Sequence, residues 1–173
     1  MAVFTVIDHT EVGVSGVTSW EATGISATYD HLYLVASYRS DDFEYLDDSL
    51  LYLNSDTGTT NYSCTRLKHN GSVSSDSSLV QIRLVNPGSR VTANTFGTAT
   101  AWIPNYANTA NFKPVLIQGA VEGATTATNT FYGYIVAGLF QSTAAVTAVK
   151  IAGQGTDKFV QYSTFTLYGV TGA

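Results

Sequence analysis

Strict alternation of side-chain types along residues 31–39, HLYLVASYR, is the feature that most constrains how this chain can fold. Successive side chains of an extended backbone point to opposite faces, so the side chains at the even positions from Leu32 to Tyr38 share one face. Their neighbours, from Tyr33 to Arg39, share the other. The stretch therefore predicts a β-strand that buries one face in a core.

The rest of the chain follows the same pattern. Residues 163–169, STFTLYG, alternate in the same way, and Val, Thr, Tyr, Phe and Ile are abundant while helix formers are sparse. Turn sequences recur at short intervals: SDTG at 55–58, HNGS at 69–72, NPGS at 86–89 and AGQGTD at 152–157. We expect strands near 2–7, 18–25, 31–39, 49–54, 61–68, 79–85, 96–103, 114–121, 130–140, 145–151 and 160–169. The chain is predicted to be all-β, an antiparallel, jelly-roll-like β-sandwich; an immunoglobulin-like sandwich, which usually has fewer strands, is the alternative.

The whole chain, 1–173, is expected to form a single domain, because no linker and no repeat of fixed period interrupts it. Two stretches are ambiguous. Residues 92–108 are read as a strand followed by a loop, since Pro104 cannot donate to a ladder. Residues 142–151 could be a helical turn that leads into a strand.

The low charge of the chain limits its partners. Charged residues make up 12% of the sequence, roughly half of the usual ~25%. The net charge is −5 with eight Lys and Arg, which argues against nucleic acid and against anionic membranes as partners. A polar, weakly charged surface suits packing against other subunits, because few charges must lose their water.

Cys64 is the single cysteine, so an intrachain disulfide is excluded and a cysteine-based zinc site lacks ligands. The first residues, MAVFTVIDHTEVG, have no basic segment followed by an apolar one. We therefore expect no signal peptide, and synthesis and assembly in a cytoplasm.

Catalytic chemistry is not expected. Asp30 and His31 are neighbours on an extended backbone and point to opposite sides, so they cannot easily pair as a base and its orienting carboxylate. We interpret them as the point where a turn enters a strand, with side chains that bond unpaired backbone groups. Asp8–His9 has the same geometry, and His69 lies in a turn. We predict that the protein is not an enzyme and needs no cofactor and no metal.

The acidic run 41–48, DDFEYLDD, holds Asp41, Asp42, Glu44, Asp47 and Asp48. Gathered carboxylates could bind Ca²⁺, but the D-x-D-x-D-G pattern is missing. A solvated loop or a contact surface is the favoured interpretation, because Phe43, Tyr45 and Leu46 interleave the acids.

Aromatic residues are numerous, with eleven Tyr and two Trp. Trp20, Tyr38, Trp102 and Phe165 are expected in the core, whereas the placement of Tyr45, Tyr106 and Tyr162 is left open. Exposed aromatics could serve sugar binding or protein contacts.

Six phrases resemble a family of small β-sandwich structural proteins of tailed phages, common among those that infect marine bacteria and cyanobacteria. They are YDHLYLVASYRSD (29–41), LLYLNSDTGTTNYS (50–63), TRLKHNG (65–71), PNYANTANFKP (104–114), GLFQSTAAVTAVKI (138–151) and YSTFTLYGV (162–170). They cover most of the chain in the expected order, although Phe140 stands where relatives often have Trp.

The resemblance implies a virion component with no catalytic residues. The first expectation is a capsid decoration protein that binds the major capsid protein as a homo-oligomer, with a trimer our expectation. The alternative is a tail or fibre module that binds a receptor or a glycan, with Tyr45, Tyr106 and Trp102 as sugar contacts. Residues 1–12 could form a docking arm or an exchanged strand. The predicted partner contacts are Val3, Phe4, Val6, Asp41, Asp42, Phe43, Glu44, Tyr45 and Tyr106.

Overall fold

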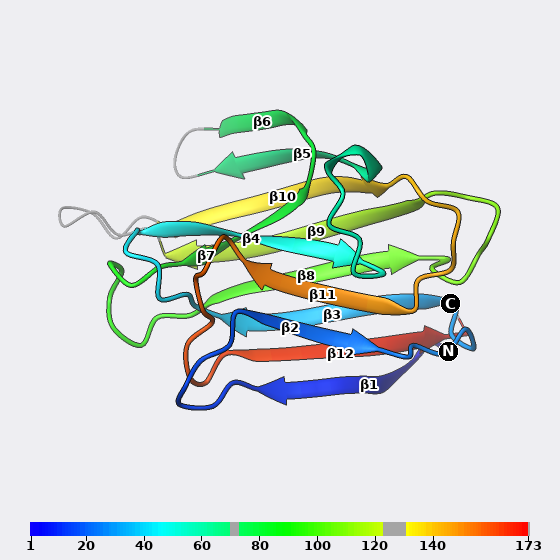
Figure 1. Ribbon diagram of the computed structural model, residues 1–173, viewed down its shortest axis with the longest axis horizontal. Coiled ribbons are helices and arrows are strands. Elements are labelled where there is room, and N and C mark those ends of the chain that lie inside the picture. Colours follow the sequence, from blue (N-terminus) through cyan, green and yellow to red (C-terminus); the bar gives the residue numbers. More distant parts are fainter. Residues whose placement is uncertain (70–72, 123–130, 173) are drawn as a thin grey trace.

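A computed structural model describes residues 1–69, 73–122 and 131–172 and contains two antiparallel β-sheets that pack as a sandwich (Figure 1). The all-β prediction is confirmed. The elements are β1 (Val3–Glu11), β2 (Ser19–Thr23), β3 (His31–Tyr38), β4 (Leu46–Leu53), the 3-10 turn η1 (Thr59–Asn61), β5 (Tyr62–His69), β6 (Val73–Leu79), β7 (Ile82–Pro87), β8 (Gly97–Pro104), β9 (Lys113–Glu122), β10 (Phe131–Phe140), β11 (Ala148–Gly153) and β12 (Thr164–Thr171).

The strand order is that of a jelly roll with additions. The larger sheet runs β1-β12-β3-β8-β9-β10-β5-β6 and the smaller β2-β11-β4-β7. The pairs β2·β11, β3·β8, β4·β7 and β5·β6 are nested within one another, as in a long antiparallel hairpin folded over on itself. The hairpin β9–β10 is inserted between β8 and β5, and β1 and β12 extend one edge.

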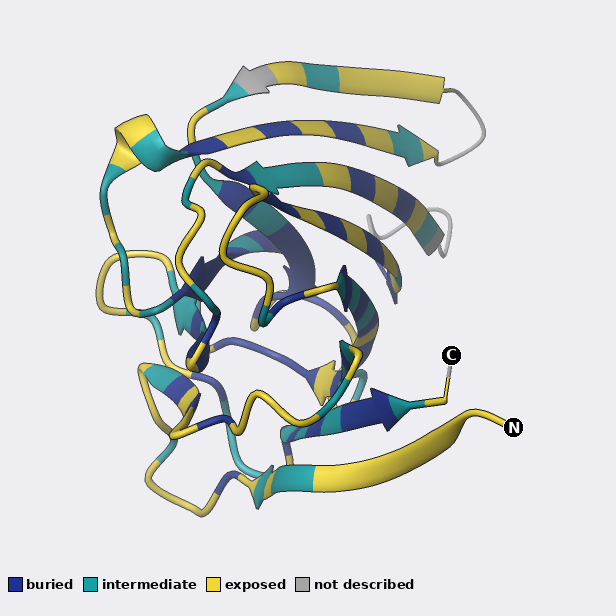
Figure 2. Ribbon diagram, turned by 90° about the vertical axis from the view of Figure 1, so that its right-hand side faces the viewer, coloured by how far each residue is buried: buried dark blue, intermediate teal, exposed yellow. Residues whose placement is uncertain are grey.

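Alternation along the strands builds the core. In β3 the side chains of Leu32, Leu34, Ala36 and Tyr38 are buried, while those between them are partly or fully exposed. Figure 2 shows the same effect as alternating dark blue and yellow bands along many strands. The prediction from residues 31–39 is therefore confirmed, and the buried rows face the smaller sheet.

An aromatic cluster fills the core between the sheets at one end. The Trp20 and Phe165 rings are stacked with centroids 5.4 Å apart, and Phe159 lies 5.1 Å from Phe165 and 5.6 Å from Tyr38. The Tyr38 hydroxyl pairs with Ser49 Oγ at 3.1 Å, so its buried polar atom is satisfied. Of the four aromatics expected inside, Trp20, Tyr38 and Phe165 are buried.

Trp102 is the exception, and its predicted place in the core is wrong. Ala101 and Ile103 occupy the buried positions of β8, so the side chain between them points out and is partly exposed. Because Ala101 is small, the sequence does not indicate that Ala101 faces the core and that Trp102 does not.

Several predicted boundaries also needed correction. The strand expected at 79–85 starts at Ile82, and the edge strand β6 was missed because VSSDSSL is polar on both faces. Residues 142–147 contain no helical turn, and the strand after them is β11. β8 ends at Pro104, which agrees with a strand followed by a loop. β4 begins at Leu46, ahead of the predicted 49.

The part of the chain that the structure describes contains no helix long and apolar enough to cross a membrane.

We predict that Phe165→Ala destabilises the protein by about 3–5 kcal/mol, because it empties the centre of the aromatic cluster. Phe43, which is 76% exposed, offers a matched control. Phe43→Ala should change stability by less than ~1 kcal/mol. Urea unfolding followed by tryptophan fluorescence measures both, and equal losses would contradict the assignment of the core.

Candidate functional site

The larger sheet presents a broad face directed away from the smaller sheet, which we call the outer face. Its central members are Phe4, Val6, Tyr33, Val35, Thr65, Leu67, Thr98, Thr100, Trp102, Leu116, Gln118, Ile135, Ala137, Thr166 and Tyr168. None of these residues is Asp, Glu, Lys or Arg. On strands of this length charged side chains would normally occupy the solvent face, so their absence marks this face as unusual.

Strand register aligns the apolar members of the outer face into one row. Val6 pairs with Tyr168, Tyr168 with Tyr33, and Tyr33 with Trp102. Trp102 then pairs with Leu116, and Leu116 with Ala137. This apolar row crosses β1, β12, β3, β8, β9 and β10 without interruption. Directly opposed side chains in a sheet touch, so the row forms a continuous ridge of apolar and aromatic surface.

Aromatic contacts hold part of this row in place. Phe4 approaches the Tyr33 and Tyr168 rings edge-on, with centroids 5.7 and 6.1 Å away. The Trp102 ring lies 6.0 Å from Tyr33 and 4.9 Å from the His31 ring. Leu116 and Val6 nevertheless remain 45% and 55% exposed. The row is therefore ordered by its own packing but still open to solvent.

The predicted N-terminal contacts Val3, Phe4 and Val6 lie on β1, which is an edge strand of the larger sheet. β1 pairs with β12 of the same chain along its length, with a bulge between Val6 and Asp8. Its other edge has no partner strand within the described residues. The use of β1 as a docking arm or exchanged strand stays a prediction.

The predicted contacts Asp41, Asp42, Phe43, Glu44 and Tyr45 lie at the opposite end of the sandwich, between β3 and β4 (Figure 1). Backbone hydrogen bonds tie this segment to residues 88–90, including Ser89 N to Asp42 O at 2.7 Å. The Arg90 guanidinium stacks over the Tyr45 ring at 4.3 Å and near the Phe43 ring at 5.4 Å. The segment is thus an ordered loop whose aromatic faces are partly covered by a cation of the same chain.

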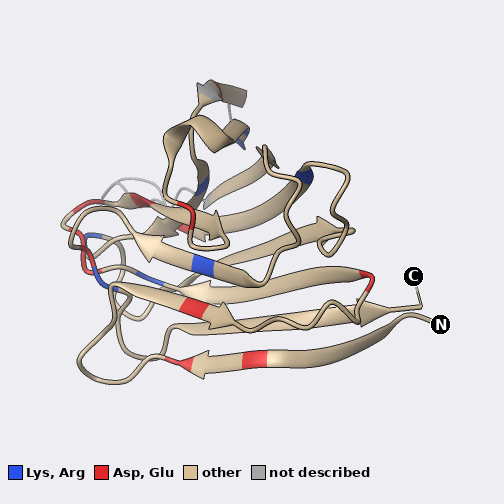
Figure 3. Ribbon diagram, turned by 45° about the vertical axis from the view of Figure 1, so that its right-hand side comes forward, with Lys and Arg blue, Asp and Glu red and all other residues tan. Residues whose placement is uncertain are grey.

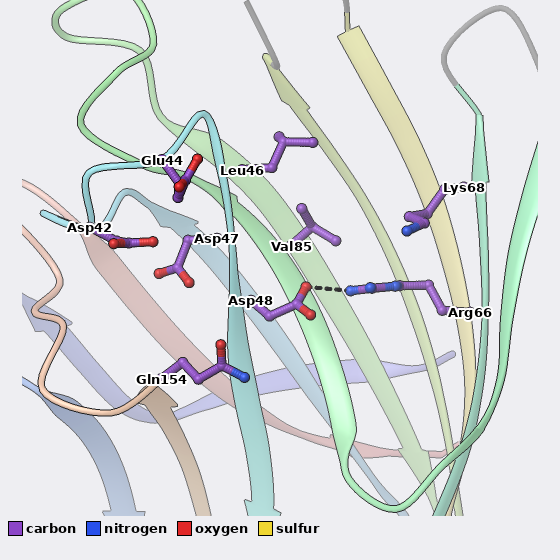
Figure 4. A pocket seen from close by; sticks show the side chains of 9 residues that line it. All are labelled: Asp42, Glu44, Leu46, Asp47, Asp48, Arg66, Lys68, Val85 and Gln154. Carbon is purple, nitrogen blue, oxygen red and sulfur yellow. Dashed lines mark hydrogen bonds and ion pairs between the residues drawn. The ribbon is translucent and has the colours of Figure 1, made fainter.

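The last two acids of the run belong to β4 and point in different directions. Asp48 forms ion pairs with Arg83, on β7 of the smaller sheet, and with Arg66, on β5 of the larger sheet. Asp47 points between the sheets and is buried. An open cavity of about 340 Å³ separates the acids Asp42, Glu44 and Asp47 from the bases Arg66 and Lys68 (Figure 4). Figure 3 shows many of the charged residues gathered at this end, away from the two termini.

Asp47 has an unusual electrostatic environment. Its pKa is raised to about 6, mainly by burial and to a lesser extent by the carboxylates of Asp42 and Asp157. The Ser40 hydroxyl and the Asn86 amide act in the other direction and lower the pKa. The Asn86 contact is long, with Nδ2 donating to Asp47 Oδ2 at 3.4 Å. Within the described residues, Asp47 forms no ion pair with a cation that would offset its loss of water.

Tyr106, expected as a surface contact, is completely buried, so that prediction is wrong. Its hydroxyl donates to the Ser26 carbonyl, and Tyr29 N donates to the same hydroxyl at 3.4 Å. The ring therefore anchors the loop before β3 from inside. Tyr45, Tyr106 and Trp102 do not meet, so they form no common sugar platform.

The interpretation of Asp30 and His31 as strand-end residues is confirmed. Asp30 Oδ2 accepts from Gly172 N at 2.8 Å, and His31 Nδ1 accepts from Asn105 N at 3.1 Å. Both bonds satisfy backbone donors at the ends of neighbouring elements. His9 instead bonds Thr166 Oγ1 at 2.8 Å on the outer face, so these histidines do not gather into one site.

A comparison with models of known protein families gives no match, and neither does a comparison with curated proteins or with solved structures. The function is therefore inferred from the phrases that carry the phage resemblance and from the surface described above.

We predict that Asp47→Asn stabilises the protein in metal-free buffer at pH 8, by on the order of 2–3 kcal/mol. The folded-state pKa of about 6 lies above the unfolded value of 3.8, so the folded protein holds the proton more tightly. The wild type therefore loses stability as pH rises from about 4 to about 6, and the variant does not.

Thermal unfolding in EDTA from pH 3.5 to 8 measures this difference. Glu11→Gln, on exposed β1, is the control for the loss of one charge and should follow the wild type. If the melting temperatures of the wild type and of Asp47→Asn change in parallel with pH, the raised pKa of Asp47 is contradicted.

Proposed function

We propose that this protein is a non-enzymatic structural subunit that binds other protein surfaces through its outer face. The observation that carries the proposal is the apolar row from Val6 to Ala137, on a face whose central members include no charged side chain. Burying such a face removes apolar area from water without stripping water from ions.

The size of the face supports this role. In the order of the larger sheet, seven neighbouring strands run from β1 through β12, β3, β8, β9 and β10 to β5. Strands ~4.8 Å apart and about eight residues long give an area on the order of 700–900 Å². A stable protein interface buries about 800 Å² per partner. The outer face is therefore large enough for one complete interface.

The net charge of −5 also favours this face for self-association. Two copies that met through their acidic loops would repel each other, whereas two outer faces that meet at their central members bring no carboxylates together, since Glu11 lies at the end of β1. A second copy is thus one partner that the face can accept, which supports a homo-oligomer; the trimer stays our expectation.

On the phage resemblance, we propose that the assembled structure is a virion and that the protein is a capsid decoration protein bound to the major capsid protein. Many weak, repeated contacts through an uncharged face would stabilise a shell by their number. The alternative is a tail or fibre module that binds a receptor or glycan, which the partly exposed rings of Trp102, Tyr33 and His31 favour.

We predict that Leu116→Glu abolishes self-association while leaving the fold intact, because it places a carboxylate in the middle of the apolar row. Thr23→Glu is the matched control, since Thr23 is exposed on β2 of the smaller sheet. Sedimentation velocity measures the oligomer and circular dichroism the fold. Wild-type protein that is monomeric at 100 μM, or Leu116→Glu that still associates, would contradict the use of the outer face between copies.

Antibody labelling of intact particles by electron microscopy separates the two virion roles. A regular lattice of label over the head is the expected result for a decoration protein. Label confined to one vertex would overturn decoration and favour the tail module, and particles without label would overturn both.

A further inference from the structure

Three carboxylates from distant parts of the chain converge at the acidic end of the sandwich. Asp42 follows β3, Asp47 lies on β4, and Asp157 lies between β11 and β12. One oxygen of each lies within 4.8 Å of the others. None of the three forms an ion pair with a Lys, Arg or His within the described residues. Three like charges this close repel one another unless protons or a cation compensate them.

Two buried side chains next to Asp47 have polar atoms without a hydrogen-bond partner. Ser40 and Asn86 are both completely buried, and Ser40 Oγ and Asn86 Oδ1 are unpaired. Asn86 is the register partner of Asp47 and contacts its carboxylate through Nδ2. The Ser40 hydroxyl lies close enough to Asp47 to lower its pKa, although no hydrogen bond forms between them. Unpaired buried oxygens are rare in native proteins, and an ion or a water is one of the partners that can satisfy them.

We propose that Asp42, Asp47 and Asp157 bind one Ca²⁺ ion, with Ser40 Oγ available as a neutral ligand and Asn86 Nδ2 contacting the Asp47 carboxylate. Ca²⁺ takes oxygen ligands at about 2.3–2.6 Å, so two oxygens on opposite sides of the ion are up to roughly 5 Å apart. The carboxylate spacing of 4.8 Å or less fits inside that sphere. Water can complete the coordination, because Asp42 and Asp157 are only half-buried.

Ca²⁺ fits this set of ligands better than Mg²⁺. Mg²⁺ demands a tight octahedron at about 2.0–2.1 Å and usually keeps several waters, whereas Ca²⁺ accepts irregular sets of carboxylate and neutral protein oxygens. The ligands here come from separate segments with no repeating loop, which is an irregular set. This explains why the D-x-D-x-D-G pattern is absent although the carboxylates do converge.

The bound ion would join three connections at one end of the sandwich. The segment 41–45 and the segment 154–160 are otherwise linked mainly by backbone bonds, such as Asp41 N to Lys158 O at 2.9 Å. An ion held by Asp42, Asp47 and Asp157 would clamp both segments to β4. The protein would then be stabilised by Ca²⁺ whether or not it assembles through the outer face.

Calorimetric titration of EDTA-treated, dialysed protein with CaCl₂ tests the proposal. We expect one site per chain with a Kd of about 10⁻⁵–10⁻³ M. At 100 times the Kd, the melting temperature should rise by about 5–10 °C. Asp42→Asn and Asp157→Asn, both at half-buried positions, should each weaken binding at least tenfold and lose most of this rise.

Glu11→Gln makes the same change in net charge far from the cluster and should bind as the wild type does. Absence of binding at 5 mM CaCl₂ would overturn the proposal. Binding that both Asp variants retain would also overturn it, since the ion would then be elsewhere. Titration with MgCl₂ should give at least tenfold weaker binding, and equal affinity would contradict the choice of Ca²⁺. Sedimentation velocity with and without Ca²⁺ keeps this result separate from self-association.

Discussion

The two-residue period of the strands links the core to the surface of this protein. In β3 and β8, each apolar side chain that enters the core places its neighbour on the outer face, so the two surfaces cannot vary independently. Tyr33 and Trp102 are exposed because Leu32 and Ile103 are buried. A slip of one residue in register would exchange the core-facing and the outer side chains and destroy the core, so the apolar row is fixed together with the core.

The fold could be predicted from this period, but the sites could not. Alternation and turn residues were sufficient for a jelly-roll-like sandwich, and the strand-end bonds of Asp30 and His31 followed from their position. The prediction placed Trp102 in the core because it is the large apolar side chain of β8. The core position next to it is instead taken by Ala101, whose small side chain does not mark a core position in the sequence. Tyr106 lies in a loop, where no period tells a buried ring from an exposed one.

The other parts of the two surfaces depend on pairing between residues that are far apart in the sequence. Leu116 and Ile135 join the outer face only because β9 and β10 are inserted between β8 and β5. Asp157 lies more than a hundred residues after Asp42 in the sequence, and only the packing of the two sheets brings them together. The central positions of the outer face carry no charge, and many of the acids, among them the buried Asp47, lie at the end of the sandwich where the β3–β4 and β11–β12 connections meet.

The central claim is that the apolar row of the outer face is the surface that meets other proteins. Hydroxyl-radical footprinting with mass spectrometry tests it directly, by comparing side-chain oxidation in assembled protein and in protein diluted to monomers. The account predicts strong protection of Trp102, Tyr33 and Leu116 on assembly, with Val14 and Phe43 oxidised equally in both states. Unchanged oxidation of Trp102 and Leu116, with protection elsewhere, would contradict it.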